Sequence, residues 1–168
     1  MSSIEDIRGE PEQKKTTSKK ALLAVFIVFL VLFIGLWIVY FVFHPVTVIG
    51  PSMEPTYHGG QFLMTKTSFD REDISYGTVV VFYSPENGQK LIKRVVALPG
   101  DTVEVKKEGV WLNGKPTNDE FGGAINETTG EIRLATDSYY VLGDNRNNSV
   151  DSRSFGPIRF DDIANIVR

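Results

Sequence analysis

The hydrophobic residues of this chain follow two different patterns. Residues 21–43 form one unbroken apolar block of 23 residues without a charged side chain. A helix of that length, at about 1.5 Å per residue, reaches roughly 35 Å and spans a bilayer with some tilt. Beyond residue 43, apolar residues come in short runs with period two, separated by Gly, Pro and Asn. The pattern therefore predicts one transmembrane helix followed by a domain of β-strands.

The runs after the apolar block predict an all-β domain of antiparallel sheets. The predicted strands are residues 46–49, 61–65, 78–83, 91–97, 102–105, 110–112 and 138–142. Asn113-Gly114 supplies the positive-φ positions of a tight hairpin turn between two such runs. Residues 115–137 are rich in Asn, Thr and Gly, so we expect a loop or small subdomain there.

The charges around the apolar block predict its orientation. Four lysines precede it within residues 14–20, whereas the first lysine after it is Lys66. The positive-inside bias then places residues 1–20, predicted to be a disordered tail, in the cytoplasm and residues 44–168 outside the cell membrane. A cleaved signal peptide is the alternative, but its apolar region is shorter, roughly 7–15 residues, and is followed by small residues.

Composition excludes several classes of protein. Among 168 residues there is no cysteine, which excludes a disulfide scaffold and any zinc site built on thiolates. After residue 43 the chain has thirteen Lys and Arg against seventeen Asp and Glu. No basic stripe is available to neutralise phosphates, so we expect no nucleic-acid partner. No cofactor or metal is implied.

The first candidate for chemistry is Ser52, nine residues beyond the apolar block. It lies in Gly50-Pro51-Ser52-Met53-Glu54-Pro55-Thr56, where two prolines leave the backbone few conformations. A rigid turn suits a nucleophile, which needs a fixed attack geometry. A plain Pro-Ser turn is the alternative interpretation.

The second candidate is Lys93. Alternation within residues 91–97 places it on a face that is otherwise apolar, while Ile92 and Arg94 lie on the other face. Burial disfavours the ammonium and lowers its pKa, which would make the lysine a general base near neutral pH. The alternative is a lysine whose amine reaches solvent from an edge strand.

The third candidate is the polar stretch of residues 143–156, directly after a predicted strand. A calcium loop is excluded, because Arg146 stands where an oxygen ligand belongs and Phe155 replaces the bidentate Glu. Arginines interspersed with carboxylates suggest ion pairs that hold the loop in one conformation.

Together, these segments give the chain a resemblance to the type I signal peptidases, membrane-bound Ser/Lys proteases. The family pattern Ser-Met-x-Pro-Thr after the anchor is matched by residues 52–56. The lysine segment matches residues 93–101 with Ala97 in place of the usual Gly, and the closing Gly-Asp-Asn-Arg-x-x-Ser-x-Asp-Ser-Arg-x-Phe-Gly pattern matches residues 143–156 in full. The Gly-x-Val-Val-Phe strand matches residues 77–82, with Val81 inserted.

The resemblance implies a role for each matching residue. Ser52 would be the nucleophile, Lys93 the general base and Ser149 the hydroxyl that orients the lysine amine. Asp151 with Arg94 and Arg153 would form the salt-bridged group behind the site. The Ser52 N–H would serve in the oxyanion hole; some relatives have a Ser or Thr hydroxyl two residues before the nucleophile, where this chain has Gly50. The single apolar span is like that of the single-anchor forms common in Gram-positive bacteria.

The substrates implied are secretory preproteins at the surface of the lipid bilayer, with small residues at positions −1 and −3 of the signal peptide. An extended peptide would add to the sheet, with alternate side chains in narrow apolar pockets. We expect Val79, Val81, Ile92 and Val95 to build those pockets.

Three other functions remain open at this point. A Ser/His mechanism through His58 would want a carboxylate to orient the histidine. A membrane-tethered β module could bind a partner without catalysis. A self-cleaving repressor peptidase uses the same pair of residue types but would want a DNA-reading domain in place of the anchor.

Overall fold

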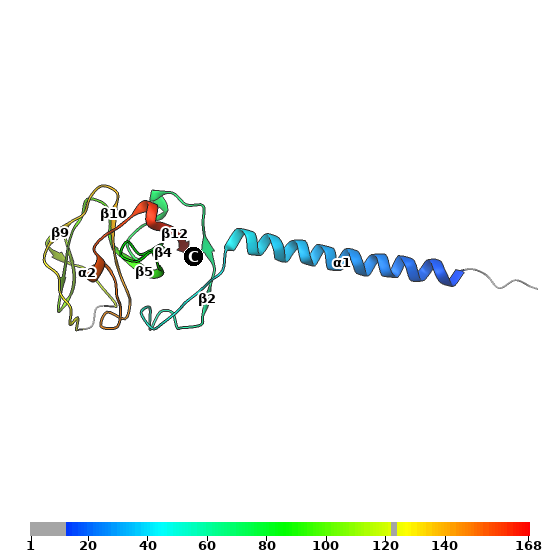
Figure 1. Ribbon diagram of the computed structural model, residues 1–168, viewed down its shortest axis with the longest axis horizontal. Coiled ribbons are helices and arrows are strands. Elements are labelled where there is room, and N and C mark those ends of the chain that lie inside the picture. Colours follow the sequence, from blue (N-terminus) through cyan, green and yellow to red (C-terminus); the bar gives the residue numbers. More distant parts are fainter. Residues whose placement is uncertain (1–12, 122–123) are drawn as a thin grey trace, which may run out of the picture. The chain divides into compact units, whose positions relative to one another are not determined.

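A computed structural model describes residues 13–121 and 124–168 of the chain. The chain divides into two compact units, with the boundary between Val42 and Phe43. Most of the first unit is one helix, α1 (Gln13–Phe43), and the second is the β domain (Figure 1).

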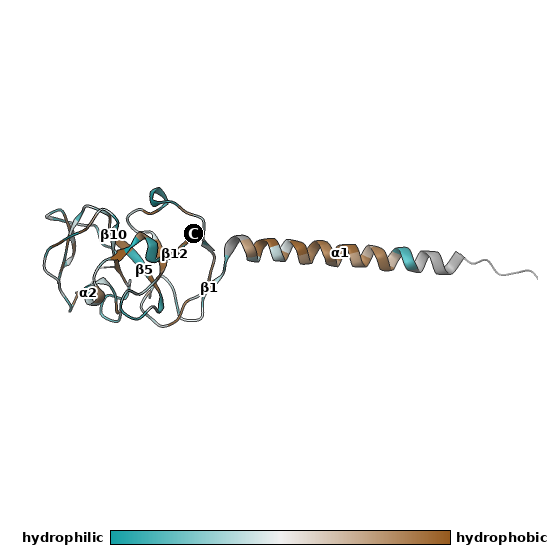
Figure 2. Cartoon of the chain, turned by 45° about the horizontal axis from the view of Figure 1, so that its top comes forward, coloured by the Kyte–Doolittle hydropathy of each residue, from teal (hydrophilic) through white to brown (hydrophobic). Residues whose placement is uncertain are grey.

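From Ala21 onward the α1 helix is apolar on all sides. Its stretch Lys19–Phe41 has a mean hydropathy of 3.2 and none of it is buried by other protein. Figure 2 shows hydrophobic residues along most of its length. Such a surface is stable in lipid, where the helix satisfies its own backbone hydrogen bonds. Among the described residues this is the one helix long and apolar enough to cross a membrane.

The helix begins earlier than the apolar block. Residues 13–20, which were expected to belong to a disordered tail, are helical. Once the apolar segment has nucleated the helix, Gln and Lys extend it at little cost, since both are good helix formers. The rest of the predicted tail, residues 1–12, lies outside the described residues.

The β domain consists of antiparallel sheets, as predicted. A six-stranded sheet has the order β11-β10-β5-β4-β12-β3, a four-stranded sheet the order β8-β7-β6-β9, and β1 pairs with β2. The strands are β1 (Val46–Thr47), β2 (Phe62–Leu63), β3 (Thr65–Lys66), β4 (Val79–Tyr83), β5 (Lys90–Ala97), β6 (Thr102–Lys106), β7 (Gly109–Leu112), β8 (Lys115–Pro116), β9 (Ile132–Arg133), β10 (Ser138–Leu142), β11 (Ile158–Arg159) and β12 (Ile163–Val167).

The short helical segments lie between these strands. They are the 3₁₀ turns η1 (Arg71–Asp73) and η2 (Phe160–Asp162) and the one-turn helix α2 (Ser152–Phe155). Asp151 caps α2, since its side chain accepts the Arg153 N–H. This cap ties the polar stretch after β10 to a regular element.

Strand β12 is the main element that the sequence pattern did not predict. It pairs with both β4 and β3, so it lies inside the six-stranded sheet. Asn165 interrupts its apolar pattern, yet this side chain is buried and donates to the hydroxyl of Thr65 at 2.6 Å. The partner that makes the buried amide tolerable comes from a strand 100 residues away.

Strand β5 is the framework of the domain. The β4–β5 register places Val80 opposite Lys93 and Val81 opposite Ile92, and β10 pairs along the other edge of β5. Val80 and Val95 belong to one buried cluster, and Val81 and Ile92 to another. Because both edges of β5 are paired and both faces are covered, its backbone is held firmly where the lysine leaves it.

Residues 115–137 contain the short strands β8 and β9, which flank β7 and β6 in the four-stranded sheet. The inner side chains of that sheet share one buried cluster with Ala97, Tyr140 and Leu142 of the six-stranded sheet. The two sheets therefore pack on a common core, and the 115–137 segment is attached to the same body as the polar loop after β10.

Candidate active site

Ser52 lies on a tight turn between β1 and β2. Gly50, two residues before it, has φ of +82°, a conformation that favours glycine. Within the turn the Glu54 N–H donates to the Pro51 carbonyl at 3.1 Å and the Tyr57 N–H to the Met53 carbonyl at 2.9 Å. Met53 is completely buried in the cluster that contains Val81 and Ile92. The turn is therefore anchored in the core by the residue next to Ser52.

Lys93 meets Ser52 directly. Its Nζ donates to Ser52 Oγ at 2.8 Å and to the Ile92 carbonyl at 2.9 Å. The lysine is only 3% exposed, so little water is available to solvate its amine. The two residues are 41 positions apart in sequence, and β5 and the anchored turn bring them together.

The environment of Lys93 favours the neutral amine. Burial lowers the pKa of the Lys93 ammonium from 10.5 to about 8, against the opposing effect of the Asp151 and Asp144 carboxylates. A substantial fraction of the amine is therefore free at mildly alkaline pH. A neutral amine 2.8 Å from a hydroxyl is placed to take its proton as the hydroxyl oxygen attacks.

Ser149 lies close to the Ser52 turn. A Cβ built on Gly143 would fall 2.2 Å from Ser149 Oγ and 2.6 Å from the Ser52 carbonyl oxygen, so these groups crowd around a position that admits only glycine. Ser149 Oγ is buried and has no hydrogen-bond partner among the described residues, Lys93 included. A buried hydroxyl without a partner is unfavourable unless another group uses it.

Asp151 and Arg153 form a fully buried ion pair. Arg153 Nε donates to Asp151 Oδ1 at 2.8 Å and Nη2 donates to Oδ2 at 2.7 Å, and both side chains are 0% exposed. Asp151 Oδ2 also accepts the Gly143 N–H at 3.0 Å. The pair therefore fixes the start of the polar loop where Gly143 passes Ser149 and Ser52.

Arg94 belongs to a different ion pair from the one expected. The resemblance grouped it with Asp151 and Arg153, but its guanidinium forms a bidentate pair with Asp144, at 2.8 and 2.7 Å. Lys93 and Arg94 are consecutive in β5, so their side chains leave opposite faces of the strand. No ion pair joins Arg94 to Asp151 within the described parts of the chain. Arg94 therefore holds the loop one residue after Gly143.

A further ion pair was not predicted at all. Arg146 pairs with both carboxylate oxygens of Asp119, and its Nε donates to the Gly143 carbonyl at 2.9 Å. Asp119 lies within residues 115–137, which the sequence pattern presented only as a polar excursion. No local signal marks it, because its partner is 27 residues away.

A cavity of about 150 Å³ borders Ser52 and Lys93. Its other lining residues are Val46, Thr47, Ile49, Val81, Lys90, Leu91 and Ile92. Of the four residues expected to build pockets, Val81 and Ile92 line this cavity. Val79 and Val95 are not part of its lining: Val79 packs in the same buried cluster as Val81 and Ile92 without bordering the cavity, and Val95 belongs to another cluster and borders a separate cavity. The prediction is corrected at this cavity for these two, because alternation alone does not tell which cavity, if any, a side chain borders.

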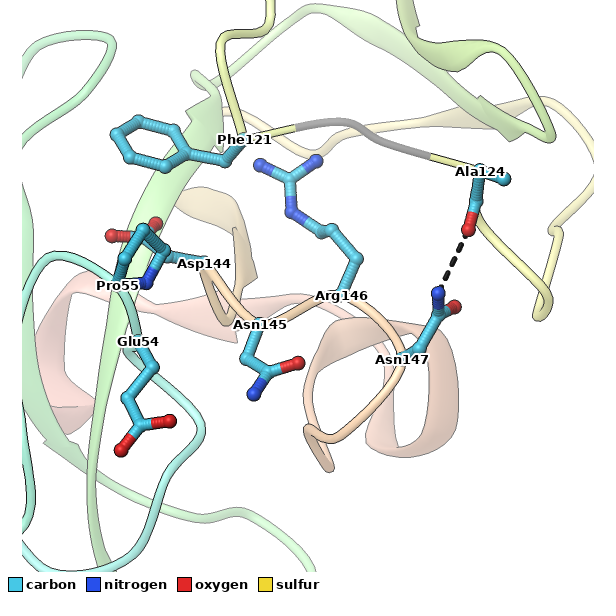
Figure 3. Close-up of a pocket in the computed structure, with 8 residues that line it drawn as sticks. All are labelled: Glu54, Pro55, Phe121, Ala124, Asp144, Asn145, Arg146 and Asn147. Carbon is cyan, nitrogen blue, oxygen red and sulfur yellow. Dashed lines mark hydrogen bonds between the residues drawn. The ribbon is translucent and has the colours of Figure 1, made fainter.

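A second cavity, of about 330 Å³, borders the same turn at Glu54 and Pro55 (Figure 3). The remaining lining comes from Phe121, Ala124 and the loop residues Asp144, Asn145, Arg146 and Asn147. Asp144 and Arg146 are neutralised by their partners Arg94 and Asp119, as described above. The turn that bears Ser52 thus has one largely apolar cavity and one polar cavity beside it.

His58, the alternative base, has a different environment. Its side chain is 69% exposed and its Nδ1 lies 3.6 Å from Glu54 Oε1. In the described residues no hydrogen bond joins His58 to Ser52, whose hydroxyl accepts from Lys93. No group of three His, Cys, Asp or Glu side chains in these parts of the chain could hold a metal ion.

Comparisons with known proteins point in one direction. The family model described as signal peptidase, peptidase S26, matches residues 19–168. A signal peptidase I of Bacillus amyloliquefaciens is 34% identical over 157 residues, covering 85% of this chain and 83% of that protein. Signal peptidase I P of Bacillus subtilis subsp. natto is 35% identical over 148 residues, covering 81% and 76%. The crystal structure of a signal peptidase I from Enterococcus faecalis covers 56% of this chain and 97% of its own, at 26% identity and a TM-score of 0.49.

The buried lysine predicts a pH-dependent stability. Between about pH 8 and 10.5 the unfolded chain keeps a proton on Lys93 that the folded chain has lost, so the free energy of unfolding rises with pH in that window. Lys93→Met removes this effect. Between pH 7 and 11 the free energy of unfolding of wild type should rise, relative to that of Lys93→Met, by roughly 3 kcal/mol at most. Denaturation of the detergent-solubilised proteins at several pH values measures this difference.

Lys107→Met is the matched control, because Lys107 is an exposed lysine of the same domain. Its difference from wild type should stay nearly constant over the same pH range. A constant difference for Lys93→Met as well would show that Lys93 does not titrate below its ordinary range.

Proposed function

Because this chain belongs to the signal peptidase family of peptidase S26, we propose that it removes signal peptides with Ser52 as nucleophile and Lys93 as general base. The protein is a serine endopeptidase anchored in the membrane. The observation that carries the assignment of the dyad is the 2.8 Å contact between a nearly unexposed lysine amine and the Ser52 hydroxyl. Membership in this family removes the alternatives of a non-catalytic module and a repressor peptidase.

The proposed reaction has two halves that use the same pair. In the first, neutral Lys93 takes the hydroxyl proton while Ser52 Oγ attacks the scissile carbonyl carbon. The resulting ammonium gives that proton to the departing amine of the mature protein, and the signal peptide remains as an ester on Ser52. In the second half, Lys93 takes a proton from water, the hydroxide attacks the ester, and the released Ser52 oxygen regains a proton.

We assign the supporting groups from their contacts. Ser149 would aim the lysine amine once it turns toward it, since its hydroxyl is buried beside the turn and has no hydrogen-bond partner among the described residues. Asp151 and Arg153 would hold Gly143 and thereby Ser149 in place. The Ser52 N–H would stabilise the oxyanion of the tetrahedral intermediate, and Gly50 contributes no side-chain donor.

The substrates we propose are secretory preproteins whose signal peptides have small residues at −1 and −3. A cavity of about 150 Å³ with Val81 and Ile92 in its wall accommodates small side chains next to Ser52. Ser52 lies only nine residues beyond the end of α1, so the scissile bond must come close to the membrane surface. The lysines before the apolar block support a cytoplasmic N-terminus and a catalytic domain on the outer side.

Substitution of the lysine tests the dyad. Lys93→Arg keeps a positive charge that cannot be lost near neutral pH, so cleavage of a preprotein should fall by about three decades, as for Ser52→Ala. Wild-type kcat/KM should rise with pH through about 8, because only the free amine is active. Lys107→Arg, on the exposed surface, should cleave normally. A Lys93→Arg enzyme of near-normal rate, or inactivation by His58→Ala, would assign the base to histidine.

Gly143 is expected to tolerate no side chain. Gly143→Ala places a methyl group 2.2 Å from Ser149 Oγ and 2.6 Å from the Ser52 carbonyl oxygen, so the loop and the nucleophile turn must separate. We expect kcat to fall by about two decades in assays on preprotein, since small misplacements of reacting groups have effects of this size. Gly130→Ala is the control, because that position is open. Normal cleavage by Gly143→Ala would contradict the tight packing around Ser52.

The size of the cavity predicts the tolerated substrates. Preproteins with Ala→Phe at −1 or at −3 should be cut at least tenfold more slowly, because a phenyl ring does not fit beside Val81 and Ile92. Ala→Phe at −2, where the side chain of an extended peptide points away, is the matched control. Equal cleavage of all three preproteins would show that the cavity does not receive these side chains.

A further inference from the structure

Asn145 holds the backbone of the nucleophile turn at two successive carbonyls. Its N–H donates to the Ser52 carbonyl at 3.0 Å, and its side-chain Nδ2 donates to the Pro51 carbonyl at 3.2 Å. The Pro51 carbonyl also accepts the Glu54 N–H within the turn. The side chain of Asn145 thus reaches across 94 positions in sequence to the peptide unit that precedes Ser52.

That peptide unit contains the proposed oxyanion donor. A trans peptide is planar, so the Pro51 C=O and the Ser52 N–H point in opposite directions from the same plane. Whatever fixes the carbonyl therefore fixes the direction of the N–H. Among the described residues the structure records no acceptor for the Ser52 N–H, whereas the carbonyl of the same unit has two donors.

The loop that bears Asn145 is held firmly enough to act as a support. Asp144, the residue before it, forms the bidentate pair with Arg94. Arg146, the residue after it, pairs with Asp119 and donates to the Gly143 carbonyl. Two bidentate ion pairs, one on each residue that flanks Asn145, leave the backbone at Asn145 little freedom. In Figure 3 the Asn145 side chain points away from the Arg146 guanidinium and lies on the side of Glu54.

We propose that Asn145 is a positioning residue that holds the Pro51–Ser52 peptide plane so that the Ser52 N–H faces the oxyanion. This inference rests on the proposed function. A preorganised donor acts in the transition state, when charge has developed on the carbonyl oxygen, and removal of such a donor lowers kcat by about 10²–10³-fold. Loss of the Asn145 amide leaves the donor present but less well aimed, because the Glu54 N–H still holds the carbonyl. We therefore expect a smaller effect, about tenfold in kcat.

Two variants separate positioning from packing. Asn145→Ala removes the side chain, and Asn145→Asp keeps its shape but replaces the amide donor with a carboxylate oxygen that the Pro51 carbonyl repels. Both should lower kcat about tenfold or more on a preprotein substrate, with KM nearly unchanged. Asn148→Ala is the matched control, since Asn148 is an exposed asparagine of the same loop.

The pH profile is the readout that distinguishes this role from others. Asn145 acts on the oxyanion side of Ser52, so the acidic limb of kcat/KM should keep its midpoint near pH 8 in Asn145→Ala, whereas the new carboxylate of Asn145→Asp would move it upward by favouring the Lys93 ammonium. Assays use the full chain in detergent micelles, with rates expressed per folded molecule after thermal unfolding curves have been measured. A full kcat for Asn145→Ala, a wild-type rate for Asn145→Asp, a loss confined to KM or a shifted midpoint in Asn145→Ala would each overturn the proposal. Failure of wild type to cut preproteins would instead refute the proposed function.

Discussion

The structure depends on the removal of one lysine amine from water. Lys93 leaves a strand that is paired on both edges, and its amine ends against the hydroxyl of Ser52. A buried ammonium is unfavourable, so the surrounding protein has to supply the stability that this residue does not. The shared core of the two sheets provides it, and the completely buried Met53 fixes the opposite member of the pair. The same burial that makes the site costly lowers the pKa of the amine to about 8, so that part of it is unprotonated and able to accept a proton near neutral pH.

The polar loop after β10 solves a second problem, which is to hold several groups around one turn without a hydrophobic core of its own. Three arginine–aspartate pairs do this. One pair lies within the loop, and each of the other two joins a loop residue to a residue elsewhere in the domain. Each pair fixes a different point: Gly143 through Asp151, the next residue through Arg94, and the segment beyond through Asp119. Since bidentate pairs are directional, they define position as well as contribute attraction. The loop therefore behaves as a rigid part of the site.

Much of this arrangement could be predicted from sequence, and the exceptions have a common cause. The transmembrane segment and the strands from residue 46 to 142, except the short β8 and β9, follow from local hydrophobic patterns. Strand β12 was missed because Asn165 breaks its pattern and finds its partner, Thr65, far away in the chain. The partners of Arg94 and Arg146 were missed for the same reason. Val79 and Val95 look like Val81 in sequence, but of the three only Val81 borders the cavity beside Ser52. Motif spacing identified Ser52 and Lys93 as candidates, but only the fold could bring them to 2.8 Å.

The position of β12 has a consequence for the life of the newly made protein. This strand comprises residues 163–167 and lies between β4 and β3, so the sheet that presents the lysine is incomplete until synthesis has passed that point. The ion pairs of the loop likewise need residues 144–153. A nascent chain that has exposed only its serine turn therefore lacks the elements that hold Lys93 and the polar loop against that turn. Ser52 and Lys93 are therefore held together by a complete sheet only late in folding, after β12 has taken its place between β4 and β3.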